Sequence, residues 1–168
     1  MSLYGWIKAI FAKNTLQIDD PVFGPLHAKW VEYRHERYVC WDTERAFPEL
    51  GEGVLVSIFT SDASGPTDWQ HDLFSELRRR FTSLRKTIES PLASEYEAIR
   101  CHWKLDSPRL ITPDEIWNVA TLIRIEINQQ HGRNSDLVLD HQINWEAEDH
   151  DLNVSITNWQ VDQVGLEG

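Results

Sequence analysis

The longest regular pattern of apolar positions lies in the middle of the chain. Its members are Trp69, Leu73, Leu77, Phe81, Leu84 and Ile88. Their spacing of three or four residues places them on one face of an α-helix. Thr67 and Gln70 have the spacing of a capping box, which marks the start of a helix. The pattern predicts a helix over residues 68–89.

A second helix is expected directly after the first. Ser90 and Pro91 are residue types typical of a helix N-cap and of the first helical position. An apolar stripe follows them, formed by Leu92, Tyr96, Ile99 and Trp103. We therefore predict a separate helix over residues 91–104, and a short one that begins at Thr112–Glu115.

Segments rich in apolar and β-branched residues flank the two helices and predict strands. Three precede the helices, at Leu26–Tyr33, Arg37–Thr43 and Gly53–Thr60. Three follow, at Thr121–Asn128, Asp136–Glu146 and Asp151–Thr157, and a last edge strand is expected around Val161 and Val164. The later strands alternate apolar and polar residues, which is typical of an antiparallel sheet with one buried and one solvated face.

These elements predict one α+β domain over residues 1–168, with a mostly antiparallel sheet and two central helices packed on one of its faces. Trp6, Ile7, Ile10 and Phe11 lie on one helical face and predict a short N-terminal helix. Residues 1–18 would form this helix and a linker, and residues 19–165 the core. Self-association through the N-terminal helix, as a homodimer, is one hypothesis for its role.

Charge is concentrated in the last third of the chain. The net charge is −11, and residues 106–168 hold 12 Asp and Glu against three Lys and Arg. Such a field repels nucleic acid and anionic membranes and attracts a basic protein. The arginines at 78–80 are read as a solvated helix face beside Glu76 rather than a nucleic-acid site. Cys40 and Cys101 form no disulfide framework, and no apolar run is long enough for a membrane span, so we expect a cytoplasmic protein.

No catalytic or cofactor motif is found, and no cofactor is expected. The best metal candidates are His141 and His150, which would approach each other if their strands pair across the intervening loop. However, His141 shares the apolar face of its strand with Leu139 and Ile143, whereas Asp140 points the other way. A half-buried histidine and a solvated hairpin are the simpler interpretation.

Two short motifs resemble a bacterial family of unknown function. The first is Asp20-Pro21-Val22-Phe23-Gly24, and the second runs from Trp145 through Asp149 and His150 to Leu152 and Val154. The resemblance covers about residues 19–165 and implies a fold but no activity. Small acidic bacterial α+β proteins of this kind include immunity proteins that block toxins, which is an analogy only.

The first functional hypothesis is a non-enzymatic module of immunity or regulatory type that binds a basic protein partner. Its contact residues would be Asp140, Glu146, Glu148, Asp149 and Asp151, with Trp159 as an apolar anchor. The alternative is a small-ligand or metal-dependent enzyme.

Overall fold

The structure is a computed structural model that describes residues 16–33, 36–43, 45–129, 135–144 and 150–167. Within these ranges the chain forms an eight-stranded sheet in the order β1 to β8, one long helix α1 and a short 3₁₀ helix η2. The strands are β1 (Gln17–Asp20), β2 (Gly24–Tyr33), β3 (Glu36–Thr43), β4 (Leu55–Thr60), β5 (Ala120–Ile127), β6 (Leu137–Ile143), β7 (Asp151–Thr157) and β8 (Gln160–Glu167).

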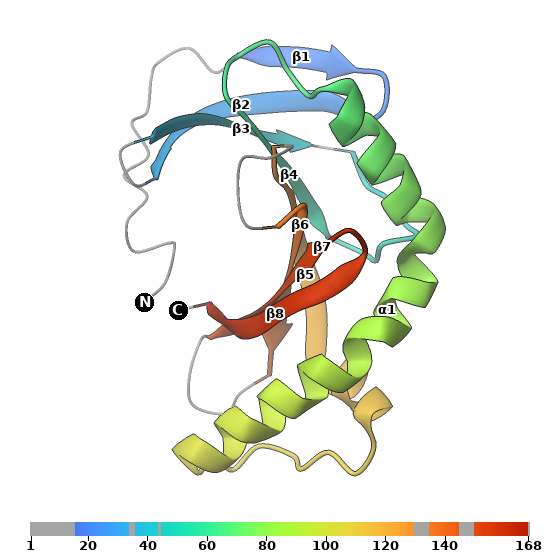
Figure 1. Ribbon diagram of the computed structural model, residues 1–168, viewed down its shortest axis with the longest axis vertical. Coiled ribbons are helices and arrows are strands. Elements are labelled where there is room, and N and C mark those ends of the chain that lie inside the picture. The colour runs from blue at the N-terminus through green and yellow to red at the C-terminus, as the bar shows by residue number, and fades with distance from the viewer. Residues whose placement is uncertain (1–15, 34–35, 44, 130–134, 145–149, 168) are drawn as a thin grey trace.

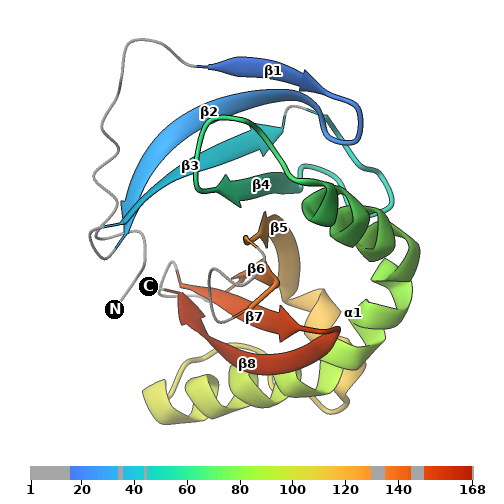
Figure 2. The same cartoon turned by 45° about the horizontal axis from the view of Figure 1, so that its top comes forward.

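Helix α1 (Asp68–Trp103) connects β4 and β5, which are parallel neighbours in the sheet. The other neighbouring strands are antiparallel. The sheet is strongly curved, and α1 follows the outer side of the curve from β4 to η2 (Pro113–Asn118) (Figures 1 and 2). The fold therefore consists of two antiparallel halves that are joined by a helical crossover.

The prediction of two central helices is wrong, because one 36-residue helix spans both of the predicted segments. Pro91 lies inside α1, where a proline removes one backbone hydrogen bond and usually kinks or ends a helix. Ile88 and Leu92 are both buried against the sheet on either side of it. Burial of one continuous apolar stripe outweighs the unfavourable proline, as tertiary packing commonly overrides local propensity. The predicted N-terminal helix lies outside the described residues.

The core lies between α1 and the face of the sheet that it covers. Neighbouring strands contribute directly paired residues to this face, as in the row Trp41, Ile58, Ile127, Leu137 and Ile156. All five are at most 1 % exposed. From the helix, Phe74, Leu77, Leu84, Ile88, Leu92, Tyr96 and Ile99 pack against them. Burial of these side chains is the main favourable contribution to folding.

The start of α1 is fixed by the predicted capping box. The Thr67 hydroxyl accepts from the Gln70 backbone N–H, and the Gln70 side-chain oxygen accepts from the Thr67 N–H at 3.0 Å. The amide nitrogen of Gln70, which is buried, also donates to the carbonyls of Phe59 and Asn128. One side chain therefore caps the helix and attaches its first turn to the ends of β4 and β5.

Gly65, in the loop before α1, gives a prediction about stability. Its φ is +98°, and a Cβ added there would lie 2.8 Å from Cδ1 of Ile18. We expect Gly65→Ala to lower the free energy of unfolding by about 2 kcal/mol, from backbone strain plus the clash. Gly53 has a φ of +72° and nothing within 4 Å of an added Cβ, so Gly53→Ala should cost less. The free energies of unfolding of the two variants can be measured by urea denaturation. Equal losses of stability would show that the clash with Ile18 contributes nothing.

Candidate functional site

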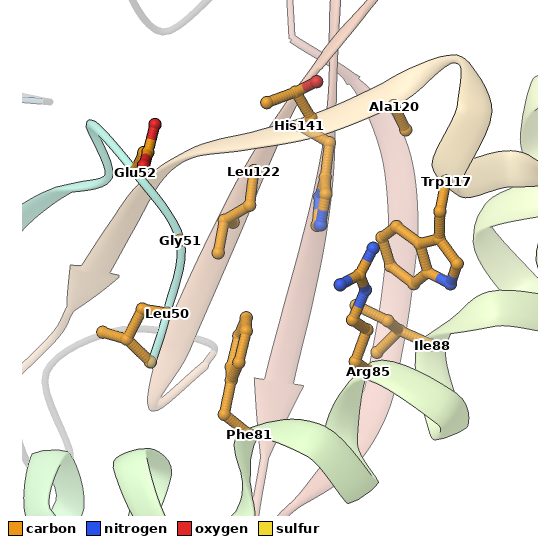
Figure 3. Close-up of a pocket in the computed structure, with 11 residues that line it drawn as sticks. Leu50, Gly51, Glu52, Phe81, Arg85, Ile88, Trp117, Ala120, Leu122 and His141 are labelled. Atoms are coloured by element: carbon orange, nitrogen blue, oxygen red, sulfur yellow. The ribbon is translucent and has the colours of Figure 1, made fainter. Parts of the chain in front are cut away.

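A pocket of about 210 Å³ lies at the N-terminal ends of the parallel strands β4 and β5, where α1, η2 and the loop before β4 meet (Figure 3). It is lined by Leu50, Gly51, Glu52, Phe81, Arg85, Ile88, Trp117, Ala120, Thr121, Leu122 and His141. These residues come from five separate parts of the chain, so only the folded domain brings them together.

The pocket has a buried floor and an exposed rim. Leu50, Ile88, Ala120 and His141 are each at most 5 % exposed and form the floor. Gly51, Glu52, Arg85 and Thr121 are exposed and form the rim. A turn in which the Leu50 N–H donates to the Phe47 carbonyl at 2.9 Å directs Leu50 inward. A ligand in this pocket would therefore place its apolar part inside and its charged part at the rim.

Trp117 is held against α1 by two contacts. Its indole N–H donates to the Glu89 carboxylate at 2.9 Å, and the guanidinium carbon of Arg85 lies 4.2 Å from the centroid of its ring. Arg85 and Glu89 are one helical turn apart and so share a face of α1. Helix η2, which begins at Pro113, presents the indole to both of them.

The Arg85 guanidinium has no carboxylate partner within 4 Å in the described part of the chain. Nearby arginines on α1 differ, because Arg78 pairs with Glu49, and Arg79 and Arg80 pair with Glu76. A guanidinium stacked on an aromatic ring keeps the N–H groups of its edge available for hydrogen bonds. Arg85 is therefore a fixed cation with available donors at the rim of the pocket.

His141 is the polar group of the pocket floor. It is 1 % exposed, and its Nδ1 lies 3.2 Å from the Leu139 carbonyl oxygen. Burial, and to a smaller extent the positive charge of Arg85, lower the pKa of His141 to about 4. Hydrogen bonds to the Leu139 and Leu152 carbonyls act in the opposite direction and raise it. The imidazole is consequently neutral at pH 7. Its ring points from β6 into the pocket near Trp117, with the two ring centroids 5.9 Å apart (Figure 3).

Glu52 gives the rim a second charge of opposite sign. It lies across the pocket from Arg85, on the loop before β4 (Figure 3). A ligand carboxylate would be attracted toward Arg85 and repelled from Glu52, so the two charges together orient an anionic group.

Three of the residues predicted to bind a protein partner lie in the described part of the chain. Asp140 is 2 % exposed and lies on the sheet face opposite α1, with an oxygen 3.7 Å from Nε of Arg124. Trp159, in the turn before β8, is half-buried, and the Arg80 guanidinium lies 5.2 Å from its ring centroid. Asp151 is half-buried in β7. Glu146, Glu148 and Asp149 lie outside the described residues.

Both faces of β6 are covered at this point, because Asp140 and His141 are both buried. The expected solvated face of the strand is therefore wrong here. Asp140 belongs to a polar cluster that also includes Arg124 and Glu126, whose charged groups are 3.5 Å apart.

The metal alternative gains no support from the described residues, among which no group of three His, Cys, Asp or Glu side chains could hold a metal ion. His141 lies beside Trp117, whereas the ring of His150 lies 5.4 Å from that of Trp103, at the end of α1. Cys40 is buried, and burial raises the pKa of its thiol far above the usual range. Cys101 is exposed.

Among the residues that line the pocket, the sequence singles out His141 as a site candidate, but not Arg85, Trp117 or Glu52. Arg85 lies on the exposed face of α1, where the sequence alone gives no sign of a site. The spacing of residues along α1 carries no information on which loop covers it. The signal that was available is the apolar Leu50 between Pro48 and Gly51, which indicates a loop that folds inward.

Comparison with known proteins gives one match. A family model described as Domain of unknown function (DUF6985) matches residues 23–167. No curated protein and no solved structure matches the chain. Among the described residues, none of the helices has both the length and the apolar character needed to cross a membrane.

Proposed function

Because the chain belongs to the DUF6985 family, for which no function is established, we propose its function from the pocket: the domain binds a small organic anion with a flat apolar body. The observation that carries this proposal is the Arg85 guanidinium, which is fixed over Trp117 without a carboxylate partner within 4 Å in the described chain. It stands at the rim of a pocket whose floor is apolar apart from His141.

An anion is favoured because Arg85 has donors to offer and a fixed position. Arginine binds carboxylate and phosphate groups through paired N–H donors, and such charge-assisted hydrogen bonds are stronger than neutral ones. The Trp117 ring restrains the guanidinium before any ligand arrives, which lowers the entropy cost of binding.

A flat apolar body is favoured by the lining of the pocket and by its volume. Phe81, Leu122 and Trp117 line the pocket with apolar surface. The volume of about 210 Å³ corresponds to roughly seven water molecules, below the roughly 300 Å³ at which pockets for drug-sized ligands begin. This suits a ligand with a single ring, for which a dissociation constant on the order of a millimolar is expected from its few atoms.

The test uses 4-fluorobenzoate and the uncharged 4-fluorobenzamide as probes, titrated against the full chain and observed by fluorine NMR. We expect the wild-type protein to bind the benzoate about tenfold more tightly than the amide, because only the benzoate pairs with Arg85. Arg85→Gln should remove this preference. The matched control is Lys86→Gln, an exposed neighbour that does not line the pocket, which should keep it.

Glu52→Gln provides a test of opposite sign. Removing a negative charge from the rim should tighten benzoate binding about twofold at low salt and leave the amide unchanged. The proposal fails if neither probe binds, or if Arg85→Gln leaves the benzoate preference intact.

Binding of a basic protein by an acidic cytoplasmic module, as an immunity protein would bind, stays a prediction from the charge of residues 106–168. Exchanging Asp151 for Lys tests the part of that surface which the structure describes. Asp140 could take part only after it is uncovered, since it is buried.

A further inference from the structure

The floor of the pocket contains a hydrogen-bond acceptor in largely apolar surroundings. We propose that a ligand in this pocket donates a hydrogen bond to Nε2 of His141, and that the natural ligands are single-ring anions with a hydroxyl or N–H group distant from the anionic one. This inference rests on the proposed function and adds the second group that the ligand must carry.

The tautomer of His141 follows from its position. The Leu139 carbonyl can only accept, so its contact with Nδ1 at 3.2 Å requires a proton on Nδ1. A neutral imidazole has one such proton, which leaves a lone pair on Nε2. The ring is neutral because burial disfavours the charged form. His141 therefore offers an acceptor to whatever enters the pocket.

No hydrogen bond to Nε2 of His141 is found among the described residues. Ile88, Ala120 and Leu122 have apolar side chains. The indole N–H of Trp117 already donates to Glu89, and Thr121 is exposed at the rim. Arg85 also stands at the rim, where its positive charge contributes to keeping the imidazole neutral. A donor on the ligand would meet the acceptor at the floor.

The buried acceptor of His141 disfavours ligands that cannot donate a hydrogen bond to it. A ligand without a donor displaces water from the floor and leaves the buried acceptor unpaired, which costs more than a typical hydrogen bond contributes. A site built around a hydrogen-bonding group rejects analogues that lack the matching group more strongly than an apolar site rejects a change of size. Arg85 would set the charge of the ligand and His141 its polar substituent.

The experiment compares 3- and 4-hydroxybenzoate with 3- and 4-fluorobenzoate, measured by competition against the fluorine signal of 4-fluorobenzoate on the full chain. We expect at least one hydroxyl compound to bind about fivefold more tightly than its fluoro counterpart. His141→Phe should abolish this difference while the fluorobenzoates still bind. His141→Gln retains an acceptor oxygen and should preserve part of it, and urea denaturation establishes that each variant is folded.

Failure of this inference can be separated from failure of the proposed function. If the fluorobenzoates bind through Arg85 but the hydroxyl gives no gain, the role of His141 is overturned and anion binding stands. The same holds if the gain persists in a folded His141→Phe variant. If none of the four benzoates binds, both proposals are overturned.

Discussion

Acidification from about pH 7.5 to about pH 5 should destabilise the wild-type domain by about 2 kcal/mol more than a His141→Gln variant. The folded-state pKa of His141 is about 4, below its ordinary value of 6.5. Between these two values the unfolded chain binds a proton that the folded domain excludes. Stability linked to the neutral imidazole is therefore fully present above pH 6.5 and lost as the pH falls toward 4.

The measurement is the free energy of unfolding in urea across this pH range for both proteins. Comparing the pH dependence, rather than the absolute stability, cancels the packing change that the substitution itself introduces. His102→Gln is the control, because His102 is exposed at the end of α1, and its profile should follow the wild type. Parallel profiles for wild type and His141→Gln would show that His141 is accessible to protons in the folded state.

Local patterns predicted β2 to β8 but not β1, because alternation of apolar and polar residues reports directly on which face is buried and β1 is too short to show it. The run at Arg37–Thr43 becomes β3, and that at Asp151–Thr157 becomes β7. The capping box at Thr67 also has its expected hydrogen bonds, since capping depends on residues only three positions apart.

The two-helix prediction failed at Pro91 because local chemistry was given more weight than the apolar stripe. Ile88 and Leu92 are four residues apart, so the stripe of the first segment continues without a shift into the second. Ser90 and Pro91 are typical of a helix start, but the apolar spacing around them is the one expected for a single continuous helix. The apolar spacing continues unchanged across Pro91, and this continuity indicates one helix rather than two.

The pocket could not be predicted because its parts are joined only by tertiary packing. Trp117 meets Arg85 because η2 returns onto α1, and a turn in the loop before β4 brings Leu50 to the same pocket. None of these contacts follows from periodicity within one element. The burial of Asp140 could not be predicted for the same reason. Alternation along β6 shows that one face is apolar and the other polar, but it does not show whether the polar face is covered by other parts of the chain.

The turn between β1 and β2 depends on one buried carboxylate. Oδ1 of Asp20 accepts from the backbone N–H groups of Val22 and Phe23 at 2.8 and 2.9 Å, and Oδ2 lies 2.8 Å from Nε2 of His71 on α1. The His71 ring in turn packs near that of Phe23, with centroids 5.6 Å apart. This arrangement gives the Asp-Pro-Val-Phe-Gly box a physical role, because it ties the first hairpin to the helix.

Asp20→Ala should lower the free energy of unfolding by about 3 kcal/mol, since it leaves two backbone donors without their acceptor and removes the partner of His71. Asp20→Asn keeps an acceptor oxygen and should cost about 1 kcal/mol. Asp19→Ala is the matched control at an exposed neighbouring position, where a change within about 0.5 kcal/mol is expected. Urea denaturation of the three variants and of His71→Gln, alone and combined with Asp20→Ala, separates the turn from the helix contact. Additive losses in the double variant would show that Asp20 acts through the turn alone, whereas a smaller combined loss identifies the bond to His71 as the link between the hairpin and α1.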